Sequence, residues 1–432
     1  MGALISIGAV IVLMLLGVPV VFSFAAMVAS LAFFYDVNVA FLATTGFSSI
    51  NSIILVALPL FVMTGYLMQE GGIAARLVRF VEALTGHSRA GMGSSMVVAC
   101  GIFGAISGTA SAAVASVGSI MVGPMQKHGY NRAYVSGLLG ISSLLGLLIP
   151  PSITMILYAV VTRQSVAACF LATIGPGILL MFFLCIYNYL TTQLNPAEAG
   201  KARVIGNRLR EIGDTGWKAV PALMLPVIIL GGIYGGVFTP TEAAAVAVAY
   251  AIPVGLFVYK GLDYKKILKC LVCAATTSGV IVIILFFSFI VSRILTFEAI
   301  PQQLTSFLLE TLENKVVILL MVNVFLILLG MIMDDISVIA IASPLLVPVM
   351  AELGIDPIHF AAIIGTSVVI GCNSPPMAPI LFMSCRVADV SVAKALRPAL
   401  ALMLFTALPV MLIVTFWSPL ALTLPGVMGY LD

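Results

Sequence analysis

A run of 37 uncharged residues, from Ala90 to Gln126, most constrains the fold of this chain. As a continuous helix it would measure about 55 Å at roughly 1.5 Å per residue, far more than one bilayer crossing needs. In its middle, residues 104–119, 13 of 16 residues are Gly, Ala, Ser or Thr. Such a segment leaves backbone polar groups that lipid cannot satisfy, so it must be buried in protein or line an aqueous cavity. We therefore expect residues 90–126 to enter the membrane and return as a re-entrant hairpin.

The composition indicates an all-α polytopic membrane protein: 62% of the residues are hydrophobic, 9% are charged and the mean hydropathy is +1.20. The lipid bilayer is its expected surrounding. The Lys and Arg residues punctuate apolar segments and form no patch with aromatic residues, so we expect no nucleic-acid partner. Cys270 and Cys273 have CxxC spacing without a second pair, and the three His residues are scattered. We expect His87, His128 and His359 to be interfacial or capping residues and propose no His or Cys metal site.

The two halves of the chain repeat at a constant offset of 225 residues. The only two Pro-Pro dipeptides, Pro150-Pro151 and Pro375-Pro376, obey this offset. The offset also pairs Leu60-Phe61 with Leu285-Phe286, Gly129 with Gly354, Gly140 with Gly365, Gly146 with Gly371, and Gly108-Thr109 with Met333-Asp334. One shared glycine would mean nothing, but a constant offset through so many positions predicts an internal duplication.

Hydrophobic segments and breaks give each half the same plan, five transmembrane helices plus one re-entrant hairpin. The first repeat, 1–192, has spans 3–17, 19–34, 52–68 and 166–190, the hairpin 90–126 and a broken helix 131–161, interrupted at 146–152. A weakly polar stretch, 36–51, joins two spans, and the segment after 68 reads as an interfacial helix. Residues 193–216 form the linker. The second repeat, 217–432, has spans near 217–236, 242–259 and 271–295, a basic loop 260–269, the hairpin 316–351 and a broken helix 357–385.

Because five spans is an odd number, the second repeat must enter the membrane inverted, and charge supports this. Cytoplasmic loops are enriched in Lys and Arg. Placing the linker in the cytoplasm leaves 17 of the 20 basic residues there, with only Arg163, Arg293 and Lys315 outside. Both termini, including Asp432, are then expected in the periplasm.

Inverted repeats with paired hairpins and broken helices are typical of secondary transporters whose site lies at the bilayer midplane. The chain has no Walker A pattern, so an ion gradient is the expected driving force. We expect both hairpin tips and both breaks to bind Na⁺ or substrate through hydroxyls, carboxylates and freed carbonyls, although Ser and Thr also allow close helix packing. The candidate residues are Ser107, Gly108, Thr109, Ser111, Gly146, Pro150, Ser152, Asp334, Asp335, Ser337, Gly371, Asn373, Ser374 and Pro375.

Three acidic residues, Asp334, Asp335 and Glu242, lie within or beside apolar segments. Carboxylates at membrane depth usually mark an ion or substrate path, which favours a functional interpretation of Asp334 and Asp335. The alternative is a helix cap or a buried salt bridge. Glu242 follows a Thr-Pro turn, and for this residue we favour helix capping.

Several motifs resemble one known family. They are Ser107-Gly-Thr-Ala-Ser111 with Gly118-Ser119, the Gly129-Tyr130 turn, Leu148-Ile-Pro-Pro-Ser152, Thr239-Pro-Thr-Glu-Ala243, Met333-Asp334 and Ser374-Pro-Pro-Met377. Over nearly the whole chain this pattern resembles the large membrane subunit of tripartite ATP-independent periplasmic (TRAP) transporters, such as DctM and SiaM. One departure is Ala378, which stands where the family pattern leads us to expect Gly.

The resemblance implies an elevator-type fold of the ion-transporter superfamily in the bacterial inner membrane. It implies import of an organic acid, such as a dicarboxylate or a sialic acid, by symport with Na⁺ and without any other cofactor. The implied partners are a small four-helix membrane subunit and a periplasmic substrate-binding protein. The alternative is a self-sufficient Na⁺/carboxylate symporter of the same architecture. An intramembrane enzyme would need a His-carboxylate or metal constellation that the sequence lacks, so we expect no enzyme.

Overall fold

The computed structural model describes residues 2–37, 39–85, 90–192, 205–312, 314–375 and 378–431, and these ranges contain helices and no strands. In the first half the elements are α1 (Gly2–Leu15), α2 (Val20–Phe34), α3 (Val39–Ile50), η1 (Ile53–Val56), α4 (Ala57–Glu70), α5 (Ile73–Thr85), α6 (Gly91–Ser107), α7 (Ala110–Lys127), α8 (Arg132–Ser143), α9 (Leu145–Leu148), α10 (Ile153–Thr162) and α11 (Val166–Thr191). In the second half they are α13 (Ile205–Tyr234), α14 (Pro240–Pro253), η2 (Val254–Val258), α15 (Tyr264–Phe297), α16 (Ile300–Thr311), α17 (Lys315–Ile332), α18 (Asp335–Glu352), α19 (Pro357–Cys372), α20 (Pro379–Ala388), α21 (Val392–Leu402), η3 (Met403–Ala407), α22 (Leu408–Phe416) and α23 (Pro419–Val427).

The element bounds follow the offset seen in the sequence. Helix α7 begins at Ala110 and α18 begins at Asp335, 225 residues later, and both are 18 residues long. The turns that follow these two helices each contain a glycine with positive φ, +83° at Gly129 and +68° at Gly354. Each turn therefore reverses the chain at a left-handed position that favours glycine.

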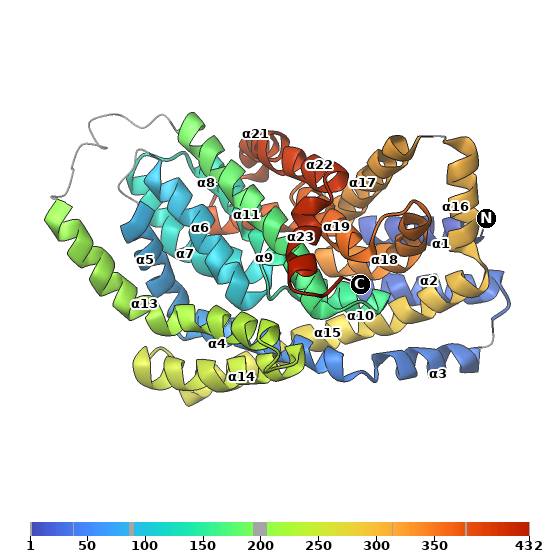
Figure 1. Ribbon diagram of the computed structural model, residues 1–432, viewed down its shortest axis with the longest axis horizontal. Helices are drawn as coiled ribbons and strands as arrows, with labels where there is room; N and C mark the ends of the chain where they lie inside the picture. The colour runs from blue at the N-terminus through green and yellow to red at the C-terminus, as the bar shows by residue number, and fades with distance from the viewer. Residues whose placement is uncertain are drawn as a thin grey trace.

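Two groups of helices surround the site and can be followed in Figure 1. The outer group consists of α2, α3, α4, α14 and α15; within it α4 packs against both α14 and α15, and α15 also packs against α2 and α3. The hairpin group consists of α6–α10 and α17–α20. Figure 1 shows α4, α14 and α15 along the lower edge, below α6–α8 on the left and α17–α19 on the right. Helices α4 and α15 reach the hairpin group through contacts with α6 and α18.

Within the hairpin group, each half packs its broken helix against the hairpin of the other half. Helix α10 packs against α18, and its counterpart α20 packs against α7. The Tyr158 hydroxyl donates a 2.6 Å hydrogen bond to the Pro357 carbonyl, which ties α10 to the start of α19. The two halves therefore share one interior.

Length and apolar character allow eight helices of the described residues to cross a membrane, or nine if the bent pair α8–α9 and α10 counts as one span. The bend between these two pieces is 43°. Helices α17 and α18 are among the eight, so their length alone does not distinguish a re-entrant hairpin from two crossings. The chain is thus a multi-pass membrane protein, while the count of five spans plus one hairpin per half stays a prediction.

The structure corrects several predicted boundaries. The stretch 36–51 contains α3, and α13 begins at Ile205, inside the predicted linker 193–216, whose first part, 193–204, lies outside the described residues. The basic loop predicted at 260–269 is shorter, because α15 begins at Tyr264 with Asp263 as its side-chain cap. The first break is also narrower than 146–152: Gly146 lies within the short helix α9, and the non-helical residues are 149–152.

Three predictions about single side chains have clear outcomes. Glu242 completes a capping box with Thr239 at the start of α14, as predicted. His128 lies at the C-terminal cap of α7 and bonds the Pro124 carbonyl. His359 is 3% exposed within α19, and its Nε2 lies 2.7 Å from the carbonyl oxygen of Val414 in the last turn of α22, so it caps the C-terminal end of that helix. His87 lies outside the described residues.

Candidate functional site

The first hairpin tip is a two-residue turn, Gly108 and Thr109, between α6 and α7. Gly108 has φ +65°, and its N–H bonds the Gly104 carbonyl. A Cβ atom at this position would also lie 2.8 Å from the Pro151 carbonyl oxygen, so both the backbone conformation and the lack of space require glycine. Thr109 caps α7 by accepting the Ala112 N–H at 3.4 Å. The tip is therefore held against the residues of the first break.

The first break docks on this tip through its backbone. Ile153 N–H, at the start of α10, donates to the Gly108 carbonyl at 3.2 Å. Ser152 is fully buried and its hydroxyl donates to the Leu147 carbonyl at 2.7 Å, which satisfies one of the carbonyls that the break frees. The hydroxyl of Ser152 is thus committed to the protein backbone, and Pro150 is buried in the same non-helical segment.

The second tip carries charge where the first carries glycine. Asp334 is the N-cap residue of α18, Asp335 is in its first turn, and Ser337 donates a hydrogen bond to Asp334 Oδ1. Negative charge is favourable at a helix N-terminus, but the Asp334 side chain makes no capping hydrogen bond to α18, so only the position of these residues agrees with the capping alternative. Neither carboxylate forms an ion pair with a basic side chain anywhere in the described part of the chain.

The second break leaves a buried amide without partners. Asn373 caps α19 and is fully buried, yet neither its Nδ2 nor its Oδ1 has a hydrogen-bond partner. Its Oδ1 faces α8, since a Cβ atom built on Gly140 would lie 2.8 Å from it. Ser374 donates to the Ile370 carbonyl at 2.7 Å, and Pro375 is in the following turn.

Paired glycines join hairpin to break in both halves. A Cβ atom at Gly104 would lie 2.5 Å from the Gly146 Cα, and one at Gly371 would lie 2.7 Å from the Gly330 Cα. The role of Gly146 and Gly371 is therefore close backbone approach of two helices, as in other membrane helix packings. The duplicated sequence pattern did not identify their partners, Gly104 and Gly330, because these two glycines do not follow the 225-residue offset.

Both tips and the helix ends that flank both breaks line a cavity of about 230 Å³, which we call the central cavity. Four helices begin at its wall, namely α7, α10, α18 and α20. The outer group closes it through α4 and α15. Its lining residues are Val62, Thr109, Ala110, Ser111, Ile153, Thr277, Ile281, Asp334, Asp335, Ile336, Cys372, Pro379 and Ile380.

A neighbouring cavity of about 250 Å³ extends from the central cavity along α4. The two share Val62, Thr109, Ser111 and Thr277, and the neighbouring one adds Ser107 of the first tip and Tyr66. The Tyr66 hydroxyl lies 3.1 Å from Thr277 Oγ1, so this pair joins α4 to α15 at the edge of the shared space.

The structure therefore brings together only part of the predicted site. Thr109, Ser111, Asp334 and Asp335 line the central cavity, and Ser107 lines its neighbour. The others lie behind the cavity walls or have hydroxyls bonded to protein: Gly108, Gly146, Pro150, Ser152, Ser337, Gly371, Asn373, Ser374 and Pro375. Sequence reasoning missed Thr277, although the run Thr276-Thr277-Ser278 within an apolar helix is a usable signal.

This fold and site define a multi-pass helical membrane protein with a small, partly charged cavity between discontinuous helices. A family model described as "Tripartite ATP-independent periplasmic transporter, DctM component" matches residues 7–420. The chain belongs to this family, as its motifs suggested. Membership makes it a multi-pass protein of the bacterial inner membrane.

Relatives agree with this assignment. The chain is 38% identical over 392 residues to the C4-dicarboxylate TRAP transporter large permease protein DctM of Pseudomonas aeruginosa, covering 91% of each chain. It is 33% identical over 426 residues to the sialic acid TRAP transporter large permease protein SiaM of Vibrio cholerae, covering 97% of each. Both relatives are named as permeases, not as enzymes. A solved structure of the Alcanivorax borkumensis YdaH transporter is similar in fold, with a TM-score of 0.57 and 15% identity over 86% of each chain.

Proposed function

We propose that this chain is the large membrane subunit of a Na⁺-coupled importer of an organic acid. In this proposal a periplasmic binding protein delivers the acid and a small four-helix subunit completes the membrane complex. The convergence of four helix N-termini on the central cavity carries the proposal. Helix N-termini present free N–H groups and positive partial charge, which suit a substrate carboxylate. The two relatives transport a C4-dicarboxylate and a sialic acid, so the proposed substrate class is a carboxylate of that kind.

The second tip supports cation coupling. Asp334 and Asp335 place two carboxylates beside the cavity without a basic partner in the described residues. Unpaired charge at membrane depth is strongly unfavourable, so a bound cation would stabilise the pair. Oxygen ligands from the tip and from freed backbone carbonyls are the kind that replace the hydration shell of Na⁺.

We further propose that the two halves have opposite orientations in the membrane. The reciprocal packing of α10 on α18 and of α20 on α7 supports a two-fold relation between them. The linker then lies in the cytoplasm and residue 432 in the periplasm. Topology reporters fused within 195–200 and after residue 432 test this; a periplasmic signal at the linker contradicts the inverted repeat.

We propose an elevator movement in which the hairpin group slides against the outer group and carries the site. Ser111 of α7 and Thr277 of α15 line the same cavity from these two groups. A Ser111→Cys, Thr277→Cys pair, in a background without the seven native cysteines, should crosslink at a rate that changes with Na⁺ and substrate. Equal crosslinking in every condition, for this pair and for others across the boundary, favours rigid gating instead.

The test of the function is Na⁺-dependent uptake into proteoliposomes with the partner proteins present. We expect Asp334→Asn, Ser107→Ala and Asn373→Ala to weaken Na⁺ dependence, and Ser116→Ala to leave it unchanged at equal reconstitution. Ser116 is a suitable control because it is buried in α7 without a hydrogen-bond partner. Wild-type Na⁺ dependence in all three test variants would remove both tips and the second break from the ion path. Uptake by this chain without partners would support the self-sufficient symporter.

A further inference from the structure

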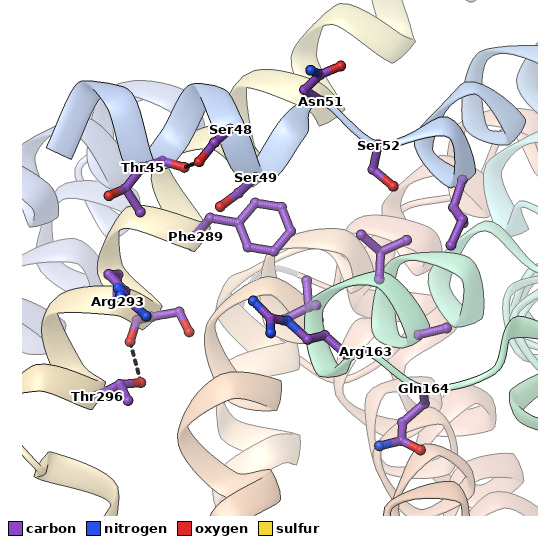
Figure 2. A pocket seen from close by; sticks show the side chains of 15 residues that line it. Thr45, Ser48, Ser49, Asn51, Ser52, Arg163, Gln164, Phe289, Arg293 and Thr296 are labelled. Carbon is purple, nitrogen blue, oxygen red and sulfur yellow. Dashed lines mark hydrogen bonds between the residues drawn. The ribbon is translucent and has the colours of Figure 1, made fainter. Parts of the chain in front are cut away.

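A second polar cavity, of about 880 Å³, lies between α3, the end of α10 and α15, and we call it the vestibule (Figure 2). This volume is within the range of small-molecule sites. Ten of its fifteen lining residues are polar or charged. They are Thr45, Ser48, Ser49, Asn51, Ser52, Arg163, Gln164, Ser292, Arg293 and Thr296.

The charge of the vestibule has one sign. Arg163 at the end of α10 and Arg293 on α15 both line it, and no Asp or Glu is among its lining residues. Neither guanidinium forms an ion pair with a carboxylate of the described ranges; Arg293 lies 4.6 Å over the Phe297 ring. Figure 2 shows the two arginines on facing elements, with the hydroxyls of α3 nearby. Guanidinium groups bind carboxylates in a two-point geometry, and Ser and Thr hydroxyls add donors.

The vestibule and the central cavity share two helices. Ile153 at the start of α10 lines the central cavity, and Arg163 at its end lines the vestibule, about 15 Å further along at 1.5 Å per residue. On α15, Thr277 and Ile281 face the central cavity while Phe289 and Arg293 face the vestibule. The two spaces are therefore stacked along the same pair of helices.

We propose that the vestibule is an entry site that binds a small organic anion through Arg163 and Arg293 before the anion reaches the central cavity. This inference rests on the proposed function, and on the orientation that places these two arginines on the periplasmic side. An uncompensated positive field raises the local concentration of anions and their rate of arrival. The site is weak, because both arginines are exposed and salt screens their charge.

A lipid headgroup shares the anionic chemistry, but the lining favours a water-soluble ligand. The wall contributed by α3 and the residues after it consists mainly of hydroxyl and amide side chains, Thr45, Ser48, Ser49, Asn51 and Ser52. An acyl chain would need an apolar wall there. The experiment therefore includes an arm with anionic lipid.

The test is chemical labelling of a cysteine placed in the vestibule of the reconstituted complex. Ser48 is exposed there, so Ser48→Cys should react with small thiosulfonate reagents, and the parent without this substitution gives the background. The measured quantity is the labelling rate of the anionic reagent divided by that of the cationic reagent. We expect this ratio to be at least tenfold higher in Ser48→Cys than in the same protein that also carries Arg163→Gln and Arg293→Gln. Lys315→Gln is the matched control, since Lys315 is exposed on the same proposed side but outside the cavity, and should change nothing.

Protection then identifies the ligand. Succinate or N-acetylneuraminate at millimolar concentration should slow labelling of Ser48→Cys, and this protection should vanish in the double variant. An unchanged reagent preference in the double variant overturns the proposal. Protection by phosphatidylglycerol vesicles but by neither acid also overturns it, in favour of a lipid site. Labelling needs no transport, so the two proposals can fail separately. If the reconstituted complex prefers the anionic reagent but shows no Na⁺-coupled uptake, the proposed function is contradicted and anion binding in the vestibule is not.

Discussion

The two hairpin tips occupy equivalent positions in the two halves but differ in backbone conformation and in charge. The first tip is neutral and depends on a left-handed glycine pressed against Pro151. The second tip turns without a left-handed residue, through Met333 (φ −114°) and Asp334 (φ −73°), and carries two carboxylates. In the second half the left-handed residue lies instead at the break, at Ala378 with φ +35°. The two halves thus have helices at matching positions, while left-handed backbone and charge lie at different places.

The largest expected effect is at the first tip. Gly108→Ala places a Cβ atom 2.8 Å from the Pro151 carbonyl in a left-handed conformation, so we expect a loss of about 2 to 3 kcal/mol in stability and loss of uptake. Thermal unfolding in detergent measures the first and proteoliposome uptake the second. Gly123→Ala in α7 is the control, because no atom lies within 4 Å of its added Cβ. Equal stability of the two variants would show that the first tip does not need its glycine.

The next effect is at the second tip, where charge rather than backbone distinguishes the halves. The double change Asp334→Asn, Asp335→Asn should raise the Na⁺ concentration for half-maximal uptake at least tenfold, about 1.4 kcal/mol, by removing the charges that favour the ion. Replacing Thr109 with Val at the neutral tip should raise this Na⁺ concentration less. A larger shift from Thr109→Val than from the double variant would reverse the proposed division between the tips.

At the second break we expect a smaller effect, a gain in stability rather than the loss expected at the first tip. Ala378 is almost fully buried and left-handed, which is unfavourable for any residue with a Cβ atom. Ala378→Gly should therefore raise stability by about 1 kcal/mol, measured as a higher unfolding temperature. Ala378→Ser keeps a Cβ atom and should give no such gain. A lower unfolding temperature for the glycine variant would show that Ala378 is held by its packing.

An effect of similar size is expected from a hydroxyl at the first break. Ser152→Ala removes the hydrogen bond to the Leu147 carbonyl and should lower stability by about 1 kcal/mol. Ser116→Ala removes a buried hydroxyl without a partner and should leave stability unchanged or slightly higher. Similar losses in both variants would indicate that packing, not the hydrogen bond, accounts for the effect.

Much of the fold followed from the sequence because uncharged length and glycine position are strong constraints. The pair α6 and α7 begins and ends within one residue of the predicted hairpin 90–126, and the pair α17 and α18 does the same for the predicted hairpin 316–351. Helix α3 was missed because its polar residues Thr44, Thr45 and Ser48 lower the hydropathy of a helix that is partly exposed.

The site was less predictable, since a helix break identifies residues near a site without showing which way they face. Thr109, Ser111 and the two aspartates reach the cavity, whereas Ser152 turns back to its own backbone and Asn373 faces α8. Thr277 comes from a helix with no break, so the pattern of duplicated breaks could not indicate it. Which side of a broken helix faces the cavity depends on packing between segments far apart in the chain.

The reciprocal packing of α10 on α18 has a consequence for biosynthesis. Residue 335 is synthesised 182 residues after Ile153, so at roughly 5 to 20 residues per second α10 waits about 10 to 40 s for the helix it packs against. During that interval the face of α10 that packs against α18 has no partner within the chain. A nascent first half would need shelter at the insertion machinery or beside another subunit. A chain truncated after α11 should accordingly be a short-lived protein in the cell, recognised by quality-control proteases rather than accumulating as a half-transporter.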